Sequence, residues 1–140
     1  MAYATQADIT AIYGEDVLLV VADRAGDGEV DAAAVERALA AATALIDTHV
    51  GVVYDTPLTF VPDLVRDLCV DIALYKLATE GNGLTEEKRT RYEDALALLK
   101  RVADGKASLG LPTTEKPKSA GAVIVSGPRR QFGRDRMRGW

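Results

Sequence analysis

The sequence has only one cysteine, Cys69, and only one histidine, His49, among its 140 residues. A single cysteine excludes a disulfide within the chain, and the two residues together offer too few ligands or catalytic partners for a typical zinc site or a His-based triad. Because Cys69 falls in the most apolar predicted helix, we interpret it as a small buried side chain. His49 lies near a predicted helix end, where a capping or packing role is expected.

Long apolar runs are also missing, so the chain contains neither a signal-peptide core nor a candidate membrane span. Together with the lone cysteine, this predicts a protein made and kept in a cytosol-like compartment, without membrane contact. The glycine patterns of a Walker A loop or a dinucleotide-binding fold do not occur. Neighbouring carboxylates such as Glu86 and Glu87 are expected on solvated helix faces. The sequence therefore gives no positive indication of an enzyme or of a cofactor.

The segment 23–31, DRAGDGEVD, resembles a calcium-binding loop only in part. If Asp23 is the first position of such a loop, Gly28 occupies the sixth position, where glycine is required. The third and the last positions, however, hold Ala25 and Ala34 in place of carboxylate ligands. We therefore interpret this segment as a glycine-rich turn that ends in a helix N-cap, and expect no metal.

Capping residues and apolar repeats predict an all-α domain. Helices are expected to start after Thr5, Asp31 and Thr85, whose side-chain oxygens can accept hydrogen bonds from free N–H groups. Pro62 is expected at the first position of another helix. The short apolar segment 15–23 is either a buried strand or a short helix, and its acidic start favours a helix. We expect a small antiparallel bundle of about four main helices with short connections.

Two predicted helices have distinctive faces. The helix that follows Asp31 has one apolar stripe, and Thr43 and Asp47 lie outside this stripe. The helix also contains many alanines, which favour helix formation and allow a neighbouring element to approach closely. The stripe consists of Val35, Ala38, Leu39, Ala42, Leu45, Ile46 and either His49 or Val50. Between residues 64 and 77 the apolar side chains nearly encircle the helix. That helix should be central, or be covered by another subunit.

The sequence changes character after Pro112, and its charge changes sign. Residues 1–112 contain 10 Lys and Arg against 19 Asp and Glu, whereas residues 113–140 contain 7 against 2. We therefore predict a helical domain over 1–112 with a net charge of −9, and an extended linker and docking arm over 113–140 with a net charge of +5. Within this C-terminal arm, the β-branched segment 122–126 predicts a short strand that needs a partner edge.

The end of the C-terminal arm combines guanidinium groups with aromatic side chains. This composition is typical of protein interface hot spots, although the same residues could neutralise phosphates and stack on bases, or belong to a solvated terminus. Composition alone leaves these alternatives open. The predicted partner-binding residues are Val123, Ile124, Val125, Arg129, Arg130, Phe132, Arg134, Arg136, Met137, Arg138 and Trp140.

Five stretches of the chain, taken in order, resemble the head-tail connector (adaptor) family of Mu-like phages and prophages. They are MAYATQADITAIYGEDVLL, DRAGDGEVDAAAVERALAAATALIDTHV, VPDLVRDLCVDIALYKL, RYEDALALLKRVADGKASLGLP and FGRDRMRGW. Together they cover nearly the whole chain. No single stretch is specific to the family, so the resemblance depends on all five stretches occurring in the same order. Ala25 departs from the more complete acidic loop that members often carry, which argues against an inherited cation site.

The resemblance implies a structural virion protein of the phage neck that is assembled in the host cytoplasm. Its implied partners are the portal protein, adjacent copies of itself in a dodecameric ring, the next neck or tail connector protein, and DNA that passes through the channel without specific binding. It implies no catalytic residues and no cofactor. The resemblance allows interface residues to be assigned only at the C-terminal end, where the sequence matches the family. These residues are Phe132, Gly133, Arg134, Asp135, Arg136, Met137, Arg138 and Gly139.

Overall fold

The computed structural model describes residues 1–81 and 83–113, and within them the chain is all-helical with no strand. The all-α prediction is therefore confirmed, while the strand expected at 122–126 lies outside the described residues. Five helices are present among these residues, one more than the four main helices predicted, because α1 and α2 are separate helices of 8 residues each. The helices are α1 (Gln6–Tyr13), α2 (Glu15–Ala22), α3 (Ala32–Val50), α4 (Asp63–Glu80) and α5 (Glu86–Ala103).

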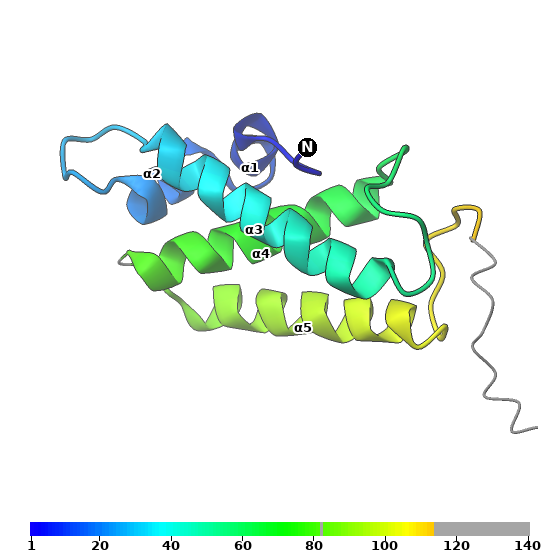
Figure 1. Ribbon diagram of the computed structural model, residues 1–140. Coiled ribbons are helices and arrows are strands. Elements are labelled where there is room, and N and C mark those ends of the chain that lie inside the picture. Colours follow the sequence, from blue (N-terminus) through cyan, green and yellow to red (C-terminus); the bar gives the residue numbers. More distant parts are fainter. Residues whose placement is uncertain (82, 114–140) are drawn as a thin grey trace, which may run out of the picture.

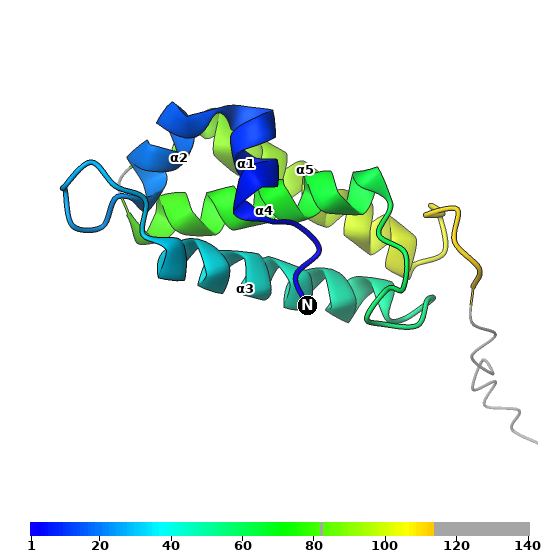
Figure 2. The ribbon, with the colours of Figure 1, turned by 90° about the horizontal axis from the view of Figure 1, so that it is seen from above.

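The three long helices α3, α4 and α5 run antiparallel to their neighbours in sequence, and α1 and α2 pack across one side of them (Figures 1 and 2). Helix α4 contacts each of the other four helices. Its buried residues are Val65, Leu68, Cys69, Val70, Ile72, Ala73, Leu74, Leu77 and Ala78. The near-continuous apolar surface predicted for this helix is thus explained by its central position within one chain.

The helix starts follow the predicted capping residues. Thr5 and Asp8 form a reciprocal capping box at α1, and the side chains of Asp31 and Thr85 accept hydrogen bonds from the backbone N–H groups of the third residues of α3 and α5. The expectation for Pro62 was wrong by one residue. Pro62 has an extended backbone (ψ 151°) and is the N-cap, so α4 begins at Asp63.

Helix α3 buries a wider face than the predicted stripe, and Thr43 was wrongly placed outside it. Thr43 is only 8% exposed, and its Oγ1 accepts a hydrogen bond of 3.1 Å from the backbone N–H of Tyr3. The chain before α1 lies over α3 and covers this side of the helix (Figure 2). For the same reason Asp47 is half-buried and accepts a hydrogen bond from the Tyr3 hydroxyl.

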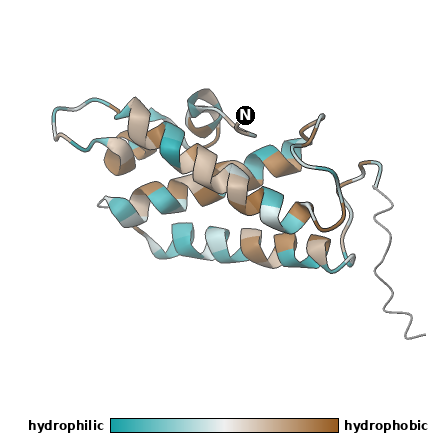
Figure 3. Ribbon diagram, in the orientation of Figure 1, coloured by the Kyte–Doolittle hydropathy of each residue, from teal (hydrophilic) through white to brown (hydrophobic). Residues whose placement is uncertain are grey.

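Hydrophilic and hydrophobic residues are unevenly distributed along α5. Figure 3 shows hydrophilic residues along the loop between α2 and α3 and along the first half of α5, whereas the second half of α5 is largely hydrophobic. None of the described helices has the length and apolar character needed to cross a bilayer.

Candidate interface surfaces

The interface residues predicted from the sequence, Val123 to Trp140, lie outside the described residues. What the structure provides is the helical body and the place from which the C-terminal arm leaves it. That place is the end of the bundle where α3 and α5 finish and α4 starts, here called the exit end (Figure 1). The opposite end, where α2 and α4 finish and α5 starts, is called the acceptor end.

At the exit end, Tyr54 fixes the chain that follows α5. Tyr54 is buried, and its hydroxyl accepts a hydrogen bond of 3.0 Å from the backbone N–H of Leu109 and lies 3.3 Å from Oγ of Ser108. Beside it is a hollow of about 420 Å³, and Phe60 on its wall is largely exposed. Residues 108 and 109 are therefore held against Tyr54, and Leu111 and Pro112 line the hollow beside it.

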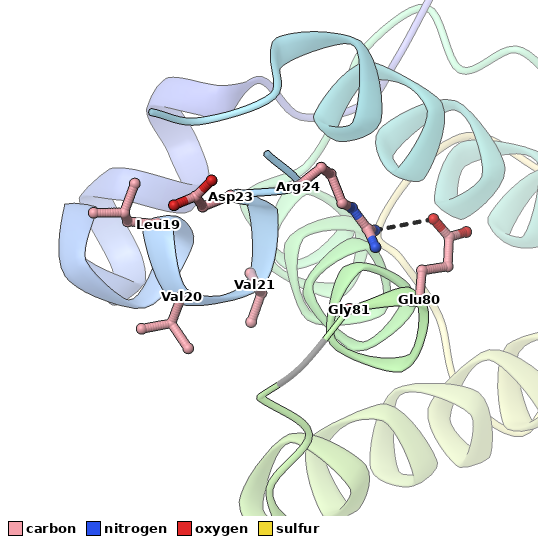
Figure 4. Close-up of a pocket in the computed structure, with 7 residues that line it drawn as sticks. All are labelled: Leu19, Val20, Val21, Asp23, Arg24, Glu80 and Gly81. Carbon is pink, nitrogen blue, oxygen red and sulfur yellow. Dashed lines mark hydrogen bonds and ion pairs between the residues drawn. The ribbon is translucent and has the colours of Figure 1, made fainter. Parts of the chain in front are cut away.

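At the acceptor end, a second hollow of about 550 Å³ lies between the ends of α2 and α4 (Figure 4). Arg24 reaches across to Glu80 and forms an ion pair with a distance of 3.1 Å between its Nη2 atom and Oε2 of Glu80. Val20 is 62% exposed at this hollow. The hollow therefore combines charged groups with an apolar side chain that has no cover within the described chain.

The loop at the acceptor end has the turn structure that the glycine pattern predicted. The carboxylate of Asp23 accepts hydrogen bonds from the backbone N–H groups of Gly26 (2.6 Å), Asp27 (3.2 Å) and Gly28 (3.0 Å), which lower the pKa of this carboxyl group. Gly26 and Gly28 have φ angles of +72° and +83°, in the left-handed region that favours glycine. No group of three metal-ligating side chains occurs in the part of the chain that the structure describes.

The two ends differ in charge. At the acceptor end, the segments 23–31 and 80–89 contain seven carboxylates against three basic residues. At the exit end, the segments 49–63 and 100–113 contain three carboxylates and three Lys or Arg. Of the two ends, only the one that lies away from the start of the basic C-terminal arm therefore has an acidic surplus.

A polar cluster that the sequence analysis missed joins α1, α4 and α5. The Tyr13 hydroxyl donates a hydrogen bond to Asp71 and accepts one of 3.0 Å from Arg91, whose guanidinium carbon lies 5.2 Å from the centre of the tyrosine ring. Burial raises the pKa of Asp71, although the Tyr13 hydrogen bond and the charge of Arg91 oppose this shift. The cluster holds the short α1 against the two long helices. No sequence pattern indicates it, because its members are separated by up to 78 positions.

Cys69 and His49, the single cysteine and histidine that were considered for catalysis or metal binding, both have structural roles. Cys69 is fully buried, burial raises the pKa of its thiol, and its sulfur lies 3.7 Å from Oγ1 of Thr43. His49 is in the last turn of α3, with Nδ1 2.9 Å from the carbonyl oxygen of Leu45. Both expectations, a buried thiol and a histidine at a helix end, are confirmed.

Within the described residues, the fold is that of a small all-helical protein. The chain belongs to the family described as Bacteriophage Mu, Gp36, whose model matches residues 3–126. It is 33% identical over 126 residues to "Gene product J" of Escherichia phage Mu, covering 89% of this chain and 88% of that protein. It is 32% identical over 139 residues to "Mu-like prophage FluMu protein gp36" of Haemophilus influenzae, covering 99% of this chain and 97% of that protein. The resemblance to Mu-like phage proteins is thus confirmed.

Proposed function

We propose that this chain is a structural protein of the phage neck, a head-tail connector that forms a ring of copies beneath the portal. In this proposal the protein has no catalytic role, and the C-terminal arm docks onto the portal or onto a neighbouring copy. DNA passes through the ring without specific binding. Membership of a Mu-like phage family is the context for this proposal.

The observation that carries the proposal is the separation of charge between body and arm. The body, residues 1–112, has a net charge of −9, and residues 113–140 have a net charge of +5. An acidic surface that faces a DNA channel repels phosphate, so the duplex can slide through without adhering. A basic segment with Phe132 and Trp140 is suited to an acidic protein surface with apolar pockets.

The experiment reverses the charge of the arm in a phage or prophage that carries this gene. With Arg134, Arg136 and Arg138 all changed to Glu, we expect filled heads and free tails that fail to join, seen by electron microscopy of lysates. The matched control reverses three exposed basic residues of the body, Arg37, Arg89 and Arg101, and should leave joining intact. Normal joining with the reversed arm would show that the arm has no docking role.

The alternative is a nucleic-acid-binding module that uses the same basic residues. It predicts retardation of duplex or single-stranded DNA by the purified protein, with an affinity that falls steeply as salt is raised because counterions are released. The acidic body opposes such binding, since its field repels an approaching phosphate chain. Retardation that the arm reversal abolishes would favour this alternative over the connector.

A further inference from the structure

The acceptor end exposes two apolar side chains that come from different segments of the chain. Val20 on α2 is 62% exposed, and Leu84, just before α5, is 42% exposed. The chain before Leu84 packs against α2, because a Cβ atom added to Gly83 would lie 3.0 Å from Cγ1 of Val20. Val20 lines the hollow of Figure 4, and Leu84 follows Gly83 directly in the chain. Both side chains are left exposed by the described residues.

Asp23 and Glu80 line the hollow together with Val20, and two of the three basic residues at the acceptor end already have partners. Arg24 is paired with Glu80, and the Lys88 ammonium group donates a hydrogen bond of 2.5 Å to the carbonyl oxygen of Gly83. Glu29 and Glu86 are exposed and form no ion pair with any described residue. The surface thus offers apolar contact together with unneutralised negative charge, which is what a segment rich in Arg and aromatic residues would bind.

We propose that the acceptor end binds the C-terminal arm of a second copy of this chain, so that copies join head to tail. The inference rests on the proposed function, in which the arm is a docking element, and names the surface that receives it. Aromatic side chains of the arm lie on Val20 and Leu84, and its arginines pair with the surrounding carboxylates. The contact joins two different surfaces, as a closed ring of identical copies requires.

Charge favours a second copy over the arm's own body. Helix α5 runs from the acceptor end to the exit end, so the described chain finishes on the side away from its own acceptor end (Figure 1). Two bodies of charge −9 repel each other when they come close, and a +5 segment placed between them reduces that repulsion for both. If the arm folded back on its own body, its positive charge would not lie between neighbouring copies and would not reduce their mutual repulsion.

The first test is intermolecular cross-linking between two full-length variants, L84C and G139C. Cys69 is fully buried and does not compete for cross-linking. After mixing under mild oxidation, we expect a disulfide-linked pair of the two chains. The control replaces L84C with L64C, because Leu64 is 44% exposed, close to the 42% of Leu84, and lies at the exit end. The L64C pair should form several-fold less product, and equal yields would overturn the proposal.

The same cysteines distinguish a second copy from the arm's own body. In the double variant L84C/G139C at high dilution, we expect little intrachain disulfide. A monomer that cross-links efficiently within itself at any dilution, while the mixed single variants do not pair, would show that the arm binds its own body. That outcome also overturns the proposal.

The second test asks whether two defective proteins complement each other. V20K should block the acceptor end but leave the arm intact, whereas R134E/R136E/R138E blocks the arm but leaves the acceptor end intact. We expect each alone to self-associate at least about tenfold more weakly than the unmodified protein, and an equal mixture to form a pair by sedimentation. V52K is the control, since Val52 is 57% exposed and lies at the exit end.

The outcomes separate this inference from the proposed function. If the reversed arm prevents joining of heads and tails while V20K associates and joins normally, the arm docks on another protein such as the portal. The inference is then wrong and the connector function stands. If the reversed arm has no effect on joining, the proposed function itself is wrong.

Discussion

At the residue scale, three tyrosine hydroxyl groups connect parts of the chain that are far apart in sequence. Tyr3 donates a hydrogen bond to Asp47 of α3 and accepts one of 3.0 Å from the backbone N–H of Leu58. Burial, together with the Asp47 contact, raises the pKa of Tyr3 to about 12. The Tyr13 hydroxyl likewise donates a hydrogen bond to Asp71 of α4, and the Tyr54 hydroxyl accepts one from the backbone N–H of Leu109, in the chain after α5. Each hydroxyl group joins backbone or side chains that helix formation alone would leave apart.

Asp71 should make the folded protein less stable as the pH rises. Because burial raises its pKa above the ordinary value, the folded state holds the proton more tightly than the unfolded state. This contribution is present below the unfolded pKa and is lost as the pH rises through the folded pKa. We expect the free energy of unfolding of the unmodified protein, measured relative to Asp71→Asn by denaturant titration, to decrease as the pH rises above about 4. An increase over the same range would contradict the assigned shift.

At the element scale, the bundle depends on small residues where the long helices pack. Ala34, Ala38 and Ala42 of α3 are buried, and α3 packs along α4. In α4, Ala73 and Ala78 are buried as well. Alanine both favours the helix and allows the backbones to approach, so one residue type serves both requirements.

Replacing Ala42 with Leu should destabilise the domain by about 1–3 kcal/mol, because a fully buried position has no room for the added carbon atoms. Ala41→Leu is the matched control on the same helix, since Ala41 is exposed and the change should cost less than about 0.5 kcal/mol. Chemical denaturation followed by circular dichroism measures both variants. Equal stability of the two variants would show that α3 does not pack closely at Ala42.

At the scale of the whole molecule, charge is distributed along the bundle as well as between body and arm. The acceptor end is acidic, the exit end is balanced, and the basic arm starts from the balanced end. In the proposed head-to-tail contact, these opposite charges meet between copies. The arrangement favours ordered association over random clustering, since like ends repel.

Association of purified copies should weaken with salt. Between about 0.1 M and about 1 M NaCl the Debye length falls from about 10 Å to about 3 Å, which screens attraction between the arm and the acceptor end. We expect the dissociation constant from sedimentation equilibrium to rise at least about tenfold across this range. R134E/R136E/R138E should associate weakly at both salt concentrations. Association that strengthens with salt would show that apolar contact, not charge, joins the copies.

The sequence by itself determined the helical architecture and most helix ends. Capping side chains such as Thr5, Asp31 and Thr85 act on N–H groups only a few positions away, so their effect can be predicted locally. The nearly all-apolar surface between residues 64 and 77 likewise indicated the central helix. The change in the sign of the net charge after residue 112 can be read directly from the sequence, because it depends only on the order of the charged residues.

Only the tertiary structure decided which surfaces lie together. Thr43 is buried because the chain before α1 crosses α3, and Val20 lies beside Gly83 because two segments that are distant in sequence meet at the acceptor end. The Tyr13, Asp71 and Arg91 cluster arises in the same way from three helices. Helical periodicity describes one helix at a time, whereas burial and pairing depend on which other segments pack against it.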